Sequence, residues 1–168
     1  MKKVYIKDEF CIGCRLCEVY CRLQHSKSTD LIKAFKKESP HPLPAVRVEE
    51  KGNLSLSVRC QHCNEPLCLY ACPAGAINRD IDSGVIGYDP DKCIGCWSCI
   101  LVCPFGAIKP DKEQKRVFRC DLCVGEEIPV CVANCPNEAL VYIELQDNGR
   151  SLGESSSLKA KQPKEKAK

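Results

Sequence analysis

The sequence predicts a small α+β fold with few short helices and hairpins, held together by a framework of cysteines. Three observations lead to this fold class. Sixteen of the 168 residues are cysteines, and they form four groups of four. The segments between the groups have the patterns of short elements, among them two hairpins. Aromatic residues are few, with the single tryptophan Trp97, so the apolar core is modest and needs support from metals or disulfides.

The four cysteine groups share their ends and differ in the middle. Each group begins C-x-x-C and ends C-x-x-x-C, and the second and fourth have wider gaps. Proline follows the last cysteine of every group except the first, where Arg22 follows. The groups are Cys11, Cys14, Cys17 and Cys21; Cys60, Cys63, Cys68 and Cys72; Cys93, Cys96, Cys99 and Cys103; and Cys120, Cys123, Cys131 and Cys135.

Two hairpins are predicted between the groups. Residues 45–59 alternate apolar and polar side chains around a Lys-Gly-Asn turn at 51–53. Residues 74–90 place apolar residues on both sides of an Asp-Ser-Gly turn at 82–84.

Three further segments complete the reading of the chain. Residues 31–39 predict a short helix that Pro40 ends. Residues 139–145 predict a closing strand. The tail, 151–168, is rich in serine and lysine, which predicts disorder.

Charge and hydropathy restrict the partners and the compartment. The chain has a net charge of +3, and the tail with its five lysines and two glutamates has the same net charge. The net charge of residues 1–150 is therefore zero, so we expect no nucleic-acid partner. The N-terminal stretch MKKVYIKDEFC lacks the apolar run of a signal peptide. No window approaches the ~20 apolar residues that span a bilayer. We therefore expect a cytoplasmic, reduced protein without a membrane span, in which metal is favoured over disulfides.

The triplet C-x-x-C-x-x-C at 93–99 predicts an iron–sulfur cluster. Three thiolates at this spacing wrap one face of a [4Fe-4S] cube, and the fourth cysteine of C-x2-C-x2-C-x3-C-P binds the other cluster of a pair. Cys103 is therefore expected to point away from the cube of Cys93, Cys96 and Cys99. Each oxidised cube with its four thiolates adds roughly −2, so the loaded protein would be acidic.

Zinc is the main alternative to iron–sulfur clusters. The C-x-x-C pairs at 60/63 and 120/123 would fit a zinc ribbon, but zinc uses two separated pairs and the triplet occurs twice. A zinc-binding interaction or regulatory module stays open as an alternative of another class, as does zinc or a three-iron cluster at one variant group. His62 is expected in a loop and not as a ligand, and His25 and His41 at the solvated surface.

The sequence contains no catalytic signature. It has no G-x-G-x-x-G or G-x4-G-K-S/T fingerprint and no plausible nucleophile–base set. We therefore expect no catalytic residues, and an electron-transfer subunit in place of an enzyme.

The cysteine pattern resembles known electron-transfer proteins. Groups two and three, with the hairpin in 73–92 between them, resemble a bacterial two-cluster ferredoxin. Residues 11–135 as a whole resemble the four-cluster subunits of the dimethyl sulfoxide reductase iron–sulfur type. The stretches EFCIGCRLCEVYC and CIGCWSCILVCPFGAI are most similar to the carbon monoxide dehydrogenase-associated, ferredoxin-like members of that family.

The resemblance implies four [4Fe-4S] clusters whose ligands come from two groups each. Each ligand set contains the C-x-x-C pair that opens one group, and we name the set after the first cysteine of that pair. The Cys11 set is Cys11, Cys14, Cys17 and Cys135; the Cys60 set is Cys60, Cys63, Cys68 and Cys103; the Cys93 set is Cys93, Cys96, Cys99 and Cys72; and the Cys120 set is Cys120, Cys123, Cys131 and Cys21.

The resemblance also implies tandem bacterial-ferredoxin-like modules, two pseudo-symmetric βαβ-type units. The outer module is expected over 1–59 and 104–150, with the hairpin 45–59 inserted, and the inner module over 60–103.

The implied function is a polyferredoxin that relays electrons between a catalytic redox subunit and an acceptor. Carbon monoxide dehydrogenase is the first partner expected, with a second redox partner that is flavin- or NAD-linked. A tungsten or molybdenum aldehyde or formate oxidoreductase, or a hydrogenase, is the alternative.

Overall fold

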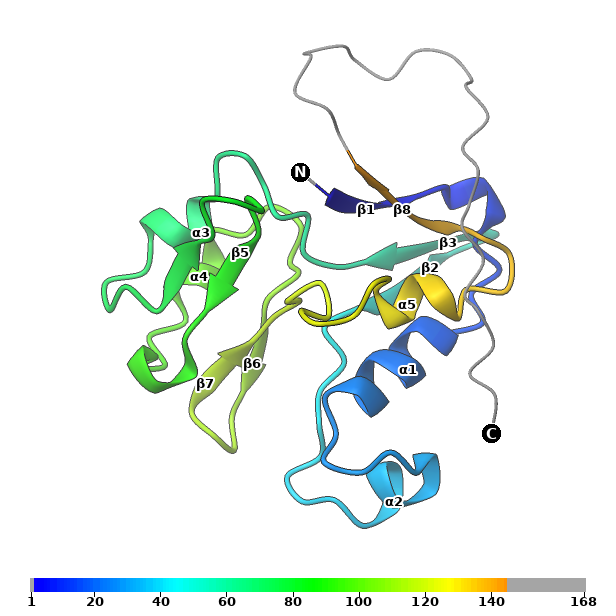
Figure 1. Cartoon of the computed structure of the whole chain (residues 1–168), viewed down its shortest axis with the longest axis horizontal. Helices are drawn as coiled ribbons and strands as arrows, with labels where there is room; N and C mark the ends of the chain where they lie inside the picture. The colour runs from blue at the N-terminus through cyan, green and yellow to red at the C-terminus, as the bar shows by residue number, and fades with distance from the viewer. Residues whose placement is uncertain (1, 145–168) are drawn as a thin grey trace.

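The computed structural model describes residues 2–144, and the tail expected over 151–168 lies outside them. Short helices and strands alternate along the chain (Figure 1). The helices are η1 (Asp8–Phe10), α1 (Leu16–Gln24), α2 (Leu31–Lys36), α3 (Leu67–Tyr70), η2 (Pro90–Lys92), α4 (Ser98–Leu101) and α5 (Val130–Ala133). The strands are β1 (Lys2–Ile6), β2 (Arg47–Lys51), β3 (Leu54–Val58), β4 (Ile77–Arg79), β5 (Ile86–Tyr88), β6 (Lys109–Asp111), β7 (Arg116–Phe118) and β8 (Leu140–Glu144).

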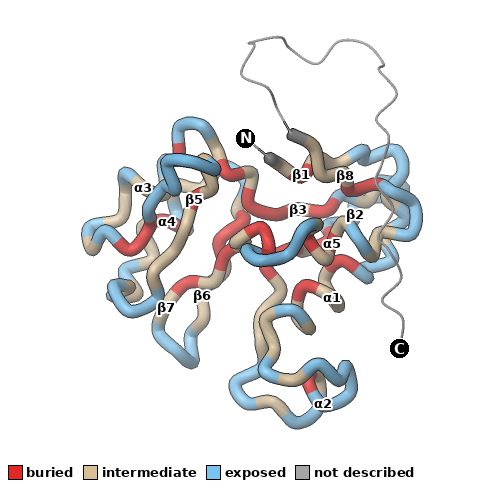
Figure 2. Tube along the Cα trace, in the orientation of Figure 1, coloured by how far each residue is buried: buried red, intermediate tan, exposed pale blue. Residues whose placement is uncertain are grey.

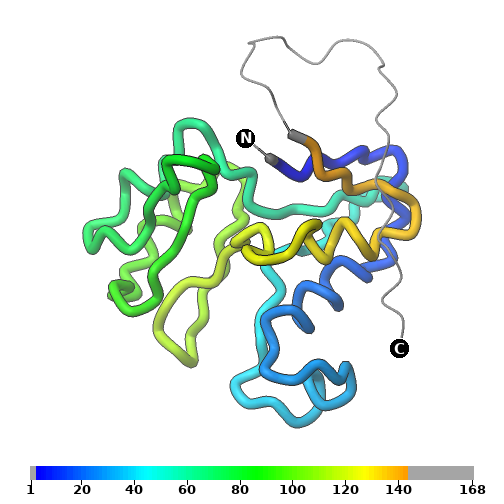
Figure 3. The backbone as a smooth tube through the Cα atoms, viewed as in Figure 1, coloured from blue at the N-terminus to red at the C-terminus, as the bar shows by residue number. Residues whose placement is uncertain are grey.

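The strands form four antiparallel two-stranded sheets. The pairs are β1–β8, β2–β3, β4–β5 and β6–β7. Both predicted hairpins are confirmed, as β2–β3 and β4–β5, and the predicted closing strand is β8. Figure 3 follows the chain back to its start, where β8 lies beside β1, with Ile6 paired with Leu140. The fold class is thus α+β, with short helices and antiparallel hairpins.

The predicted helix at 31–39 is confirmed as α2. The side chain of Asp30 accepts a hydrogen bond from the backbone N–H of Lys33 at 2.8 Å. This contact satisfies one of the free N–H groups at the start of the helix. The helix ends at Lys36, before the predicted end at residue 39, so the backbone restriction that Pro40 imposes on residue 39 acts beyond the last helical turn.

Two apolar cores contain cysteines among their buried residues (Figure 2). The first core joins β1, β8 and the segment 45–48 to Cys17, Cys21 and Cys131. The second joins Ile77 and Ile86 to Cys99, and Ile108 and Val117 belong to it as well.

The second core extends past residue 103, where the inner module was expected to end. The β6–β7 hairpin packs there with the β4–β5 hairpin, because Ile108 and Val117 lie beside Ile77 and Ile86. The division into modules remains a prediction.

Polar contacts tie β6 and the loop before it to the segment that leads into β2. The ammonium of Lys109 donates to the carbonyls of Pro44 at 2.6 Å and Val46 at 3.3 Å. The guanidinium of Arg47 donates to the carbonyl of Gly106 at 3.0 Å. These bonds hold the two cores together. Among the described helices, none is long and apolar enough to cross a membrane.

Candidate metal centres

All sixteen cysteines lie in the described part of the chain, and none of them forms a disulfide. The structure brings the members of three expected ligand sets together around pockets.

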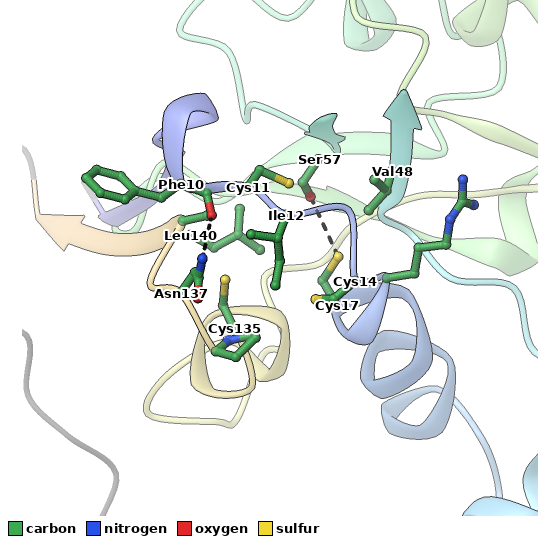
Figure 4. A pocket seen from close by; sticks show the side chains of 13 residues that line it. Phe10, Cys11, Ile12, Cys14, Cys17, Val48, Ser57, Cys135, Asn137 and Leu140 are labelled. Carbon is green, nitrogen blue, oxygen red and sulfur yellow. Dashed lines mark hydrogen bonds between the residues drawn. The ribbon is translucent and has the colours of Figure 1, made fainter. Parts of the chain in front are cut away.

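The Cys11 set lines one pocket in full, together with Ile12, Val48 and Ser57. Figure 4 shows Cys135 pointing from the far wall toward the loop that carries Cys11 and Ile12. The hydroxyl of Ser57 lies 3.9 Å from the sulfur of Cys17.

The backbone explains how this pocket forms. Gly13 and Arg15 have φ values of +68° and +58°, so the loop turns back sharply before α1 begins at Leu16. Cys17 then lies in the first turn of α1. Helix α5 packs against α1, and Cys135, just after α5, reaches the loop across more than a hundred residues of sequence.

The Cys93 and Cys60 sets line two further pockets. The Cys93 set shares its pocket with Tyr88 and Trp97. The loop repeats the geometry of the first one, because Gly95 and Trp97 have φ values of +65° and +63° directly before α4. The Cys60 set shares its pocket with Phe105 and Arg119. Each pocket combines three cysteines of one group with one of another.

The Cys120 set is the most deeply buried. Cys21 and Cys131 belong to the same apolar core, where α1 meets α5. Burial raises the pKa of Cys131 to about 12 and that of Cys123 to about 11, and the charge of Cys21 adds to both shifts. Burial also raises the pKa of Cys120, and the charge of Cys131 adds to it. These thiols are thus close enough to influence one another.

Hydrogen bonds from the backbone reach a cysteine sulfur in several places. The donors are the N–H groups of Ala45 to Cys21 at 3.2 Å, Ala76 to Cys72 at 3.3 Å, Ala107 to Cys103 at 3.5 Å and Leu122 to Cys120 at 3.4 Å. Such bonds stabilise thiolates, which are the ligand form of cysteine.

The donor sets fit a [4Fe-4S] cluster. Each consists of four sulfur atoms without oxygen or nitrogen ligands, which favours iron–sulfur clusters or zinc over hard cations. Among the described residues, no three His, Cys, Asp or Glu side chains are placed as ligands of a single metal ion. The assignment of each cysteine to a cluster remains a prediction.

The expectation for His25 was wrong. Its side chain is mostly buried, and its ring bonds the carbonyl of Cys21 at 2.7 Å and the carboxylate of Asp121 at 3.3 Å. Burial by itself lowers the pKa of His25, but the bonds to Asp121 and Cys21 outweigh it and raise the pKa to about 10. His41 is exposed, as expected.

His62 lies in a loop, as expected, but is only 1% exposed. Its Nδ1 accepts a hydrogen bond from the backbone N–H of Ile86 at 3.1 Å. Burial lowers its pKa to about 3, and the charges of Arg119 and Arg59 add to the shift. The ring is therefore neutral and joins the second cysteine group to β5.

Two buried arginines at the centres were not predicted from the sequence. Arg59 and Arg119 each precede the first cysteine of a group, in the stretches VRCQHC and FRCDLC, and both are buried. The Arg-Cys dipeptide at the start of groups two and four is the sequence pattern that could have indicated them.

The chain is similar to known iron–sulfur and electron-transport proteins. Residues 53–145 match the family described as "4Fe-4S dicluster domain". The chain is 33% identical over 152 residues to the electron transport protein HydN of Escherichia coli, covering 80% of this chain and 83% of that protein. It is 32% identical over 158 residues to an iron–sulfur protein of Rhodospirillum rubrum, covering 84% and 82%. It is 36% identical over 152 residues to the formate dehydrogenase iron–sulfur subunit of Haemophilus influenzae, covering 79% of this chain and 48% of that subunit.

Proposed function

The chain belongs to the family of 4Fe-4S dicluster proteins, and from this premise we propose that it relays electrons through four [4Fe-4S] clusters, one in each ligand set. The observation that carries the proposal is the convergence of complete sets on separate pockets. Three sets of four cysteines, each drawn from two distant groups, line three pockets. The packing of the fourth set supports its cluster, because Cys21 and Cys131 lie in one apolar core and Cys120 packs against it.

The protein's contribution is to hold, space and insulate the redox centres. When bound, each cluster takes up and releases one electron at a time, at a potential that hydrogen bonds, charge and burial adjust. The backbone N–H groups that reach the sulfurs supply such hydrogen bonds. The apolar cores around the sets exclude water.

The Cys11 and Cys93 sets are the two ends of the relay in this proposal. Cys14 and Cys96 are the two cysteines classed as exposed, and they belong to different sets. An electron would enter through one of these sets and leave through the other. After each transfer the chain would therefore return to its original oxidation state.

For the catalytic partner we propose a formate oxidoreductase. The support is the relative from Haemophilus influenzae, whose name states that it is the iron–sulfur subunit of a formate dehydrogenase. Carbon monoxide dehydrogenase, the partner first expected, is not named by the relatives given above. Oxidation of formate to carbon dioxide releases one proton and two electrons, and the chain would pass these on singly.

The partner can be tested by reduction in a mixture. Anaerobic protein should lose visible absorbance when formate and a molybdenum or tungsten formate oxidoreductase are both added, and not with formate alone. A parallel reaction contains carbon monoxide and its dehydrogenase. Bleaching by dithionite but not by the formate system would overturn the formate partner, and bleaching only with carbon monoxide would replace it.

A further inference from the structure

Two buried arginines lie between two of the ligand sets. The side chains of Arg59 and Arg119 are 2% and 4% exposed. The ion pairs found among the described residues involve other basic groups. In addition, Nε of Arg59 and both Nε and Nη1 of Arg119 are buried without a hydrogen-bond partner.

An unpaired guanidinium in the interior is energetically unfavourable. Arginine stays protonated in proteins, so burial cannot be relieved by loss of its proton. A buried charge is tolerated when an opposite charge lies close to it. No carboxylate among the described residues fills this role for Arg59 or Arg119, so the compensating anion is of another kind.

The contacts of Arg119 point to the Cys60 set. Its Nη2 donates to the sulfur of Cys60 at 3.1 Å. The residue also lines the pocket of the Cys60 set, beside Cys63, Cys68 and Cys103. Arg119 precedes Cys120 in the sequence, yet it serves the other group.

Arg59 differs from Arg119 in its contacts. Among the hydrogen bonds of the described residues, that of Arg59 goes to a carbonyl, because it precedes Cys60 and donates to the carbonyl oxygen of that residue at 2.9 Å. Of the two buried arginines, Arg119 is therefore the one that contacts a sulfur of a ligand set.

We propose that Arg119 compensates the negative charge of the Cys60 set and thereby raises the potential at which a cluster in this set is reduced. This inference rests on the proposed function. Each reduction step adds one electron, received from the partner or a neighbouring set, and adds one negative charge. A fixed guanidinium beside the set stabilises this added charge without uptake of a proton.

The surroundings of the Cys11 and Cys93 sets differ from those of the Cys60 set. Arg15 lines the pocket of the Cys11 set, but its side chain is exposed and pairs with Glu50 at 3.0 Å. The hydroxyl of Ser57 approaches Cys17 of the Cys11 set, and the backbone N–H of Ala76 bonds Cys72 of the Cys93 set. Removal of Arg119 should therefore affect the Cys60 set strongly and the Cys11 and Cys93 sets little.

The test is a redox titration of the full-length loaded protein, followed by EPR. Arg119→Gln retains an N–H donor but removes the charge, and Arg119→Lys retains the charge. Lys112→Met removes an exposed charge from the β6–β7 turn as a control.

Arg119→Gln should shift one of the four transitions to lower potential. At the potential where the Cys60 set is half reduced in the wild type, its reduced-to-oxidised ratio should fall about tenfold, which corresponds to about 59 mV for a one-electron couple. Arg119→Lys should retain most of the wild-type potential, and Lys112→Met all of it.

The outcomes separate this inference from the proposed function. Wild-type protein without four-iron clusters overturns both. Loaded Arg119→Gln protein with wild-type potentials overturns the role of Arg119 alone. If Arg119→Gln binds no iron, Arg119→Lys decides between the two readings. A loaded Arg119→Lys protein with wild-type potentials supports the role of the charge, and one with the same loss of iron overturns it.

Discussion

At the scale of residues, a recurrent backbone contact stabilises the last cysteine of a group. Ala76 and Ala107 each lie four residues after such a cysteine, and their N–H groups donate to its sulfur. The residues just before them, Gly75 and Gly106, have φ values of +61° and +54°. The positive φ turns the chain back toward the sulfur, so the stretch C-P-x-G-A is a compact sulfur-binding turn.

The crossed ligand sets can be tested by pairs of cysteine substitutions. Cys60→Ser with Cys103→Ser removes two ligands of one proposed cluster, so about four iron atoms per chain should be lost. Cys93→Ser with Cys103→Ser affects two clusters, so the loss should be about eight. Iron and acid-labile sulfide analysis of the two proteins measures the difference, and the reverse order would contradict the crossing.

The residues at the centres could be predicted only in part. The sixteen cysteines stand out by type and spacing. The crossing of groups followed from a resemblance, because spacing along the chain does not say which helices pack together. His25 was misjudged, since its burial depends on Asp121, almost a hundred residues away. Arg59 and Arg119 were missed, because an arginine in a sequence is exposed far more often than buried.

At the scale of elements, the C-I-G-C loop before α4 depends on a glycine for two reasons. Gly95 has a φ of +65°, and a Cβ at this position would lie 2.4 Å from the carbonyl oxygen of Lys115. The loop is therefore held directly against the β6–β7 turn.

Gly95→Ala should destabilise the protein more than Gly75→Ala. Both positions have a positive φ, which costs alanine about 1–2 kcal/mol. A Cβ at Gly75 meets nothing within 4 Å, whereas at Gly95 it meets backbone, which adds about 1–3 kcal/mol. Urea unfolding followed by circular dichroism and visible absorbance measures both. Equal destabilisation would show that the contact with Lys115 is unimportant.

The contact between β6 and the segment before β2 is also open to test. Lys109→Met leaves the carbonyls of Pro44 and Val46 without their donor, so the free energy of unfolding should fall by about 1–3 kcal/mol. The exposed Lys112→Met serves as the control. The midpoints of urea unfolding are compared for the two variants. An unchanged midpoint for Lys109→Met would show that this contact does not stabilise the fold.

Elements with a clear local pattern were predicted, and elements defined by distant partners were not. The hairpins β2–β3 and β4–β5 have turn sequences between their strands. The β6–β7 hairpin was missed because Pro110 occupies the middle of β6, and proline argues against a strand. Strand β1 was missed because its partner β8 is at the other end of the described chain.

At the scale of the whole molecule, the cysteines are part of both apolar cores. Cys17, Cys21 and Cys131 lie in one core and Cys99 in the other, beside short strands and helices of at most nine residues among those described. So small a core stabilises a chain of this length weakly without additional links. Bound clusters would provide such links, so folding and cluster binding should be coupled.

The most direct measurement is the iron and acid-labile sulfide content of the full-length protein, prepared without oxygen. Four loaded sets predict about sixteen of each per chain, with visible absorbance that dithionite bleaches and an EPR signal after reduction. A colourless protein that contains zinc and no acid-labile sulfide would contradict the account.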